Sequence, residues 1–280
     1  MTKLYTDTSA NLPLALLREY DIAVIPFSYT VNGVAEDYSE ETDFDGKAFY
    51  DAMRRGAEVK TSMVNPATAA AFFERALAQG DDVLYVGMSG GISGTAQAAV
   101  IAAGELTEKY PARKIVTIDT YAASLGEGLQ VLEAARMIEE GKSLDEIKAH
   151  LLSRRPHMCQ FFTVDDLAYL KRGGRISSAT ALIGTVLSIK PILCGDETGH
   201  IVSCGKVRGM KRAYQELANY YDGRALGIAH ADNEEGAQAL IALLRDKGFT
   251  GECLNVVYEP VTGAHVGPGT VALFFYGKEK

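Results

Sequence analysis

The feature that most constrains the fold is the alternation of short apolar segments with amphipathic segments in the first half of the chain. The apolar segments predict β-strands at 4–6, 22–29, 83–86 and 114–118. The amphipathic segments predict helices at 12–20, 44–54, 66–78, 95–106 and 126–140. This order indicates a mainly parallel sheet with helices on both faces.

The pattern changes after residue 143. Helices are expected at 144–153, 210–221 and 234–247, and strands at 159–163, 225–230, 255–259 and 271–276. Segments 192–193 and 201–204 predict the two strands of a hairpin, joined by a polar turn. The chain of 280 residues is long enough for two domains. We therefore predict an α/β fold with an N-terminal domain at 1–154 and a C-terminal α+β domain at 155–280; the helix within 61–79 is free to pack with the second domain.

Composition and charge exclude several classes of partner. The formal net charge is −8 and no long basic stretch exists, which disfavours nucleic acid and anionic membranes as partners. No run of eighteen apolar residues occurs, and an acidic residue at position 7 precludes a signal peptide, so we expect a cytoplasmic protein with no integral membrane segment. The cysteines at 159, 194, 204 and 253 lack metal-ligand spacing, so reduced thiols and no metal site are expected.

Polar turns follow three predicted strands, at 7–9, 89–95 and 119–120. In a parallel sheet, ligands gather beyond the carboxyl ends of the strands, where helices begin. Turn 89–95 is glycine-rich, so its backbone can approach a ligand, and Ser93 and Thr95 add hydroxyls. The alternative is that both hydroxyls only cap the next helix. The turn lacks a Walker lysine and the dinucleotide-binding spacing, which disfavours nucleotides.

Two further segments carry candidate ligand groups. Thr61 and Ser62 directly precede a predicted helix, although Ser62 or Asn65 would also serve as its cap. Segment 263–270 contains four glycine or proline residues in eight, which predicts a tight turn that holds His265. An imidazole fixed there would donate to an anion or have a structural role.

Segment 170–177 places Lys171, Arg172 and Arg175 around two adjacent glycines. A solvated loop is the simplest interpretation of such a segment. A docking surface for an acidic partner is the alternative.

An enzymatic alternative comes from residues 87–91, which fit the pattern G-x-S-x-G with Ser89 as the nucleophile. Asp119 or Asp165, followed by His265, would complete the order of an α/β-hydrolase triad, giving an esterase. No HGGG-like oxyanion segment lies upstream. A third alternative is a sensor or scaffold that holds another small anion at the same hydroxyls.

Seven segments, in order along the whole chain, resemble the DegV family: TDTSANLP, KTSMVNP, SGGISGT, TIDTYAASLGEG, LAYLKRGGRIS, IKPIL and GAHVGPGTVALFF. The fatty-acid-binding members of that family include the FakB subunits of bacterial fatty acid kinase. Two departures are Met88, where the family commonly has a hydroxyl residue, and Ala96, where it has tyrosine. Neither falls on a proposed ligand group, and both would change the shape of a site.

The resemblance implies a non-enzymatic carrier that holds a long-chain fatty acid in a tunnel within and between two domains, without a cofactor. It implies that the carboxylate is bound by Thr61, Ser93 and His265. Ser62, Gly94 and Thr95 are secondary site candidates. The implied partner is the ATP-binding subunit of a fatty acid kinase, with Arg172 at the contact.

The chemistry of such a carrier is consistent with these residue types. A buried carboxylate needs several hydrogen-bond donors or it takes up a proton, and two hydroxyls with an imidazole supply three donors. The tail would supply most of the affinity, on the order of 10 kcal/mol for roughly sixteen carbons before ordering costs. Apolar residues at 159–164 and 176–193 are the candidate tunnel walls.

Overall fold

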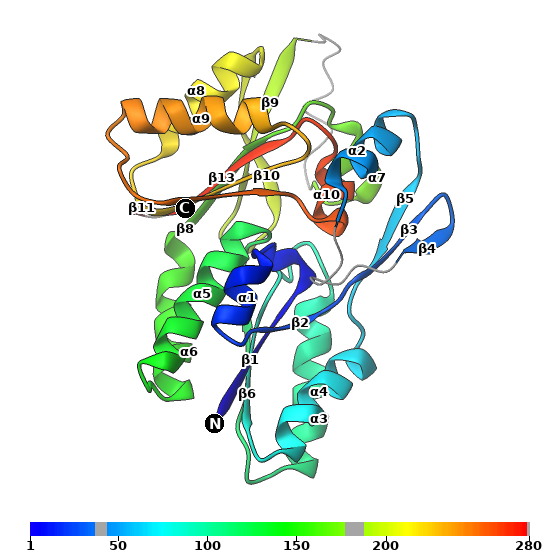
Figure 1. Ribbon diagram of the computed structural model, residues 1–280, viewed down its shortest axis with the longest axis vertical. Coiled ribbons are helices and arrows are strands. Elements are labelled where there is room, and N and C mark those ends of the chain that lie inside the picture. The colour runs from blue at the N-terminus through cyan, green and yellow to red at the C-terminus, as the bar shows by residue number, and fades with distance from the viewer. Residues whose placement is uncertain (37–43, 177–187, 279–280) are drawn as a thin grey trace.

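The computed structural model of the protein describes residues 1–36, 44–176 and 188–278. Two large sheets lie one above the other in Figure 1, with helices around them and a small third sheet at one side. The first sheet uses strands from the first half of the chain, and the second uses strands from the second half.

The first sheet has four parallel strands in the order β2-β1-β6-β7. Their bounds are β1 (Thr2–Asp7), β2 (Ala23–Ile25), β6 (Asp82–Gly87) and β7 (Ile115–Asp119). A 3-10 turn, η1 (Thr8–Ala10), follows β1. The helices are α1 (Leu14–Glu19), α3 (Pro66–Ala78), α4 (Thr95–Lys109), α5 (Leu125–Glu139) and α6 (Leu144–Arg154). Figure 1 shows α3 and α4 on one face and α1, α5 and α6 on the other.

Local sequence signals explain where these helices begin. The Asn65 side chain accepts from the backbone N–H of Thr68, and Pro66 occupies the first turn of α3. Ser143 and Glu146 form a capping box at the start of α6. Strand β6 is buried almost throughout because helices cover both faces of the sheet. The predicted parallel sheet flanked by helices is confirmed.

The second sheet is mixed and has the strand order β10-β9-β8-β13-β11-β12. Its strands are β8 (Met158–Thr163), β9 (Ile189–Gly195), β10 (Ile201–Arg208), β11 (Arg224–His230), β12 (Cys253–Val257) and β13 (Val271–Tyr276). A short 3-10 turn, η2 (Arg155–His157), precedes β8. Helices α8 (Met210–Tyr220) and α9 (Glu234–Asp246) pack on this sheet. The predicted α+β character of this part is confirmed.

Helix α5 packs against both large sheets. Its residue Leu125 lies against Gly227 of β11, where a Cβ atom would approach the leucine side chain to 2.9 Å. Likewise, a Cβ atom added to Gly126 would lie 3.1 Å from the Phe274 side chain of β13. Small residues at these positions therefore allow the start of α5 to contact the second sheet closely.

The third sheet brings an early part of the chain to the C-terminal half. It contains β3 (Ser28–Val31), β4 (Val34–Glu36) and β5 (Val59–Ser62) in the order β4-β3-β5. With α2 (Gly46–Arg54) it lies beside α10 (Pro260–Val266), close to α7 (Ala168–Gly173) in Figure 1. The Tyr50 hydroxyl donates to the Tyr258 carbonyl at 2.8 Å and fixes this arrangement. The division into 1–154 and 155–280 stays a prediction.

Three local predictions were wrong in detail. The segment 22–29 forms two strands, β2 and β3, because Pro26 lacks the N–H needed in a continuous ladder. Strand β12 ends at Val257, since Tyr258 and Glu259 leave the sheet to begin α10. The predicted turn at 263–270 is found only in its second half, at 268–269, whereas residues 263–266 are helical. His265 lies in the last turn of α10, which Glu259 caps by accepting from the N–H groups of Val261 and Thr262.

Candidate functional site

A cavity of about 70 Å³ lies at the junction of the first sheet, the second sheet and the small sheet. Most of its wall is apolar: Phe27, Met63, Met88, Ile92, Phe162, Leu170, Ile201 and Phe274. A few polar side chains converge on it: Thr61, Ser62, Ser93, Ser124, Gln160, Arg175, Thr262 and His265. A largely apolar wall with several polar side chains directed at the cavity is typical of a small-molecule site.

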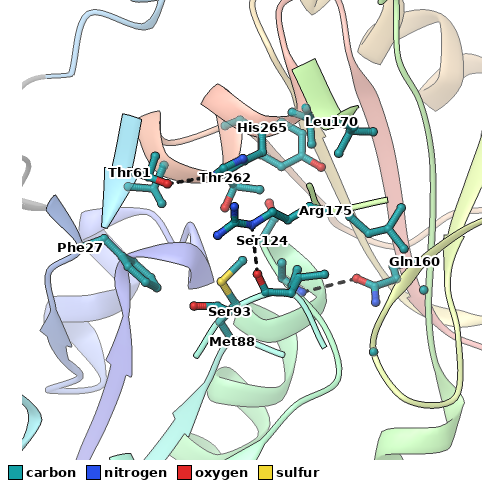
Figure 2. Close-up of a pocket in the computed structure, with 18 of the residues that line it drawn as sticks. Phe27, Thr61, Met88, Ser93, Ser124, Gln160, Leu170, Arg175, Thr262 and His265 are labelled. Carbon is teal, nitrogen blue, oxygen red and sulfur yellow. Dashed lines mark hydrogen bonds between the residues drawn. The ribbon is translucent and has the colours of Figure 1, made fainter. Parts of the chain in front are cut away.

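Thr61 and His265 form the polar pair on one side of the cavity. Thr61 lies on the edge strand β5, and its Oγ1 is 2.8 Å from Nε2 of His265 in α10 (Figure 2). The other ring nitrogen, Nδ1, faces the backbone of Gly173, where a Cβ would approach it to 2.3 Å. The glycine at the end of α7 therefore lets the imidazole ring fit between α7 and β5.

Ser93 approaches the cavity from the glycine-rich turn that follows β6. Its Oγ is 2.9 Å from the hydroxyl of Thr95 and accepts from the Thr95 N–H at 3.3 Å. The N-cap residue of α4 is Gly94, without a side-chain cap. Ser93 therefore supports the first turn of α4 and also lines the cavity.

Arg175 also lines the cavity, although the sequence analysis gave it no role there. Its Nε donates to the carbonyl of Ile92 at 3.2 Å, and its Nη1 donates to the carbonyl of Gly173. Figure 2 shows the guanidinium between His265 and Ser93. Among the described residues that line the cavity, Arg175 is the one with a permanent charge.

Burial, with a further contribution from the Arg175 charge, lowers the pKa of His265 to about 4. The imidazole is therefore neutral at pH 7 and carries one N–H. With that N–H on Nε2, His265 donates to Thr61 Oγ1, and the threonine hydroxyl is free to donate into the cavity. The pair thus offers one directed O–H donor.

The other polar residues at the wall hold the connection between the two large sheets. The Gln160 amide donates to the Tyr121 carbonyl at 2.9 Å and accepts from the Ala123 N–H at 3.4 Å. Ser124 has φ of 52° and ψ of −141°, an unfavourable backbone conformation for a residue with a Cβ. Gln160 and Ser124 gave no signal in the sequence, since each is brought to the cavity by contacts between distant elements.

The structure brings Thr61, Ser62, Ser93 and His265 to the cavity and leaves the other candidates outside it. Gly94 and Thr95 do not line it; Thr95 is buried beneath the start of α4. Arg172 is exposed and its guanidinium stacks 4.6 Å from the Tyr169 ring centroid.

Arg172 nevertheless lies close to the site. It lines a surface depression of about 470 Å³ together with Thr61, Arg175 and His265. These three residues line both the depression and the cavity. The polar end of the cavity therefore adjoins the surface beside Arg172.

The residues of the hydrolase alternative do not form a triad. Ser89 is fully buried; its Oγ donates to the Gly199 carbonyl at 2.9 Å and accepts from the Gly91 N–H at 3.1 Å. Asp119 accepts from the backbone N–H groups of Gly90 and Tyr121. Since Asp165 pairs with Lys190 and His265 pairs with Thr61, the geometry disfavours an esterase with Ser89 as nucleophile.

In the part of the chain that the structure describes, no cluster of three or more His, Cys, Asp or Glu side chains could hold a metal ion. Among the same residues, no helix is both long and apolar enough to cross a membrane. Most of the candidate tunnel wall at 176–193 falls on residues 177–187, outside the described residues. Ile176, Leu193 and several residues of 159–164 are buried.

Comparison with known proteins identifies the family. The family model described as "uncharacterised protein, DegV family" matches residues 1–278. The chain belongs to the DegV family. A DegV domain-containing protein of Clostridium perfringens, CPE0026, is 37% identical over 284 residues, covering 99% of this chain and 98% of the relative. Protein DegV of Bacillus subtilis is 32% identical over 277 residues, covering 96% of each chain.

Solved structures of DegV proteins share the fold of this chain. A DegV family protein from Thermus thermophilus, described for its fatty acid binding, has a TM-score of 0.88 and 32% identity, with 99% of each chain covered. The fatty acid binding DegV family protein SAG1342 of Streptococcus agalactiae has a TM-score of 0.87 and 31% identity, covering 100% of this chain and 99% of the other. The family and fold implied by the sequence motifs are therefore confirmed.

Proposed function

We propose that this DegV protein binds a long-chain fatty acid in the cavity, with the carboxylate at Thr61, Ser93 and His265. The observation that carries the proposal is that these three side chains, distant in the sequence, line one mostly apolar cavity. The fatty acid binding reported for DegV relatives of more than 30% identity supports the same ligand class. The protein acts as a carrier and performs no chemistry on the acid itself.

Hydrogen-bond donors from separate elements would share the two carboxylate oxygens. The Thr61 hydroxyl, oriented by the neutral imidazole of His265, donates from one side of the cavity. The Ser93 hydroxyl donates from the other side once it turns away from Thr95. Each oxygen of a carboxylate accepts more than one hydrogen bond, so the donors do not compete.

Arg175 supplies the charge that hydroxyl and imidazole groups alone do not. Its Nε and Nη1 are engaged by backbone carbonyls, whereas Nη2 has no partner among the described residues. A guanidinium near a buried carboxylate favours the ionised form of that carboxylate. Arg175 therefore belongs to the proposed headgroup site beside Thr61, Ser93 and His265.

The acyl tail requires more room than the cavity offers in this structure. An engineered apolar cavity of about 150 Å³ accommodates a benzene molecule, whereas this cavity measures about 70 Å³. Met63 and Met88 line it, and methionine side chains change rotamer readily to fill or vacate space. We expect the tail to enter as these side chains move.

Removal of a headgroup donor is the direct test of the site. Thr61→Val or Ser93→Ala should weaken palmitate binding by about 1–3 kcal/mol, roughly 5- to 150-fold in Kd, because an acceptor in the cavity loses its donor. Competition with a fluorescent fatty acid measures the affinity, and native mass spectrometry of the protein purified from cells identifies its natural ligand.

Thr107→Val and Ser153→Ala provide matched controls, since these exposed hydroxyls donate to backbone carbonyls within helices α4 and α6. Both controls should bind palmitate as the unchanged protein does. Full fatty acid content in Thr61→Val and Ser93→Ala would rule out the site, and a short polar anion in the mass spectrum would favour the sensor or scaffold.

We further propose that the loaded protein presents the carboxylate to the ATP-binding subunit of a fatty acid kinase in the cytoplasm, where an acyl phosphate forms. The depression shared by Arg172, Thr61, Arg175 and His265 supports this, because it gives a partner access to the polar end of the cavity. Arg172 contacts no acid in the described part of the chain, so its charge is available to an acidic surface.

Arg172→Ala should leave palmitate affinity unchanged and reduce phosphate transfer from ATP by at least tenfold when a bacterial fatty acid kinase subunit is added. Arg212→Ala, at an exposed position of α8, is the matched control and should transfer phosphate normally. Equal transfer by Arg172→Ala and the unchanged protein would exclude Arg172 from the contact.

A further inference from the structure

A second, larger cavity of about 740 Å³ lies where α5 and α6 meet the edge of the second sheet at β11 and β12. We call it the arginine cavity after Arg136, Arg154 and Arg245, which line it. None of its lining residues lines the cavity described above. In Figure 1, α5 lies directly beneath the edge of the second sheet near the C-terminus.

Two helices present matching faces to the arginine cavity. On α5, Leu129, Leu132 and Arg136 are spaced at three- and four-residue intervals, and all line the cavity. On α9, Ile241 and Arg245 do the same. Each helix therefore contributes an apolar floor and an arginine at its C-terminal end.

The three arginines outnumber the two acids of the lining by one charge. Arg154 lies over the Tyr276 ring at 4.0 Å from the centroid, and its Nε is 3.4 Å from Oε1 of Glu133. Arg136 and Arg245 are exposed, and their guanidinium groups have no hydrogen-bond or ion-pair partner among the described residues. The acids that line the cavity are Glu133 and Glu252, so its lining is net positive in a protein of net charge −8.

Two buried polar atoms of the same cavity lack hydrogen-bond partners. They are Nε of Arg154, a donor without adequate geometry to Glu133, and Oδ1 of Asn255, an acceptor. The Asn255 amide nitrogen is engaged, since it donates to Glu234 Oε1 at 3.0 Å. Buried polar groups are normally satisfied, so the unused N–H of Arg154 is available to an oxyanion. The Asn255 oxygen accepts only, so a bound water or a hydroxyl group, and not the anion itself, would satisfy it.

We infer that the arginine cavity binds a small organic anion in which a phosphate or carboxylate group is joined to an apolar body. The head group would lie between Arg136, Arg154 and Arg245, since guanidinium groups pair with both kinds of oxyanion. The apolar body would cover Leu132, Ile241 and Leu254. The volume lies within the range of small-molecule pockets.

The test is an NMR titration of methyl-labelled protein, preloaded with palmitate, with hexyl phosphate and with heptanoate as probes. The methyl signals of Leu132, Ile241 and Leu254 should shift with at least one probe, and which probe binds more tightly tells phosphate from carboxylate. Hexan-1-ol and inorganic phosphate should each bind at least tenfold more weakly than that probe. Hexan-1-ol lacks the charged head group, and inorganic phosphate lacks the apolar body.

The double variant Arg136→Gln/Arg245→Gln should raise the Kd of the probe at least tenfold. Arg55→Gln/Arg212→Gln removes the same charge at exposed positions of other elements and should leave the Kd unchanged. Absent shifts at the three residues, an unchanged Kd in the first double variant, or equal binding of hexan-1-ol would each overturn the inference. Palmitate retention is measured separately in the same samples. A failure of the proposed fatty acid site can therefore be told apart from a failure of the arginine cavity to bind the probe.

Discussion

At the scale of single residues, the site depends on an imidazole kept neutral by its surroundings. Burial, with the Arg175 charge, depresses the pKa of His265 to about 4, so its folded-state pKa lies below the unfolded value near 6.5. The unfolded chain then binds the extra proton between about pH 6.5 and 4. The stability associated with neutral His265 is therefore lost as the pH falls through that window.

The charge of Arg175 should be visible in the titration of the His265 ring. Arg175→Gln should raise the pKa of His265 from about 4 toward the ordinary value, because one of the two causes of the depression is removed. Bound palmitate should raise it as well, since a nearby carboxylate favours the imidazolium. Ring signals in NMR spectra recorded from pH 3 to 8 measure both changes.

Arg172→Gln removes an equal charge on the solvent side of α7 and is the matched control. The pKa of His265 in this control should stay close to that of the unchanged protein. An Arg175→Gln variant that titrates like the unchanged protein would show that the guanidinium does not act on the ring.

At the scale of elements, the hairpin of β9 and β10 closes one side of the cavity by resting on the glycine-rich turn after β6. The Gly199 carbonyl accepts from Ser89 Oγ, and Gly199 and Gly91 pack backbone to backbone, where a Cβ on Gly91 would be 2.6 Å from the Gly199 carbonyl carbon. Gly199 has φ of +79° and no space for a side chain, since a Cβ there would approach Ser89 Oγ to 2.0 Å.

Gly199→Ala should therefore disrupt this contact. Gly141→Ala is a matched control, because Gly141 has nearly the same φ of +76° but nothing within 4 Å of an added Cβ. Both variants should lose about 1 kcal/mol in free energy of unfolding through backbone strain. Gly199→Ala should lose about 1 kcal/mol more, because its Cβ has no space. Urea unfolding measures both; equal losses would mean that the hairpin contact contributes nothing.

Elements governed by local rules could be predicted from the sequence. The caps at Asn65 and Ser143 and the buried strand β6 follow from neighbouring residues, and the structure has them there. The family motifs also led to Thr61, Ser93 and His265, which line the cavity, and to Gly94 and Thr95, which do not. Local reasoning failed for segment 263–270, because its glycines suit a turn while Gly263 stands in a helix to make room for the Tyr50 hydroxyl.

Local sequence reasoning also could not decide whether Arg172 or Arg175 lines the cavity. Both lie in one basic segment, and spacing alone does not tell which arginine faces the cavity. Helix α7 ends at Gly173, and Gly174 adopts the left-handed conformation with φ of +67°. That C-cap turns the chain, so Arg175 reaches Ile92 while Arg172 stays on the helix surface.

At the scale of the whole molecule, buried carboxylates lie where the first sheet, α5 and α10 meet. Glu127 accepts from the hydroxyls of Thr6 and Ser9, Asp7 accepts from the Tyr85 hydroxyl, and Glu259 caps α10. Burial raises the pKa of each of these three acids, and raises that of Glu127 well above its ordinary value. The charge of Asp7 adds to the effect at Glu127 and Glu259.

A raised pKa in the folded state means that the associated stability is lost as the pH rises from about 4.5 through the folded-state value. Glu127→Gln should remove the largest share of this loss, so the variant should gain stability relative to the unchanged protein between pH 5 and pH 8. Urea unfolding at several pH values measures the difference, with Glu105→Gln, at an exposed position of α4, as the control. Parallel curves for Glu127→Gln and the unchanged protein would contradict the prediction.

The pairing of Thr61 with His265 also has a consequence during protein synthesis. The two residues are 204 positions apart, so the strand with Thr61 leaves the ribosome long before the helix with His265. A nascent chain that has formed the first sheet therefore still lacks the His265 side of the cavity wall. If the chain binds a fatty acid as proposed, the complete headgroup site exists only in the finished polypeptide.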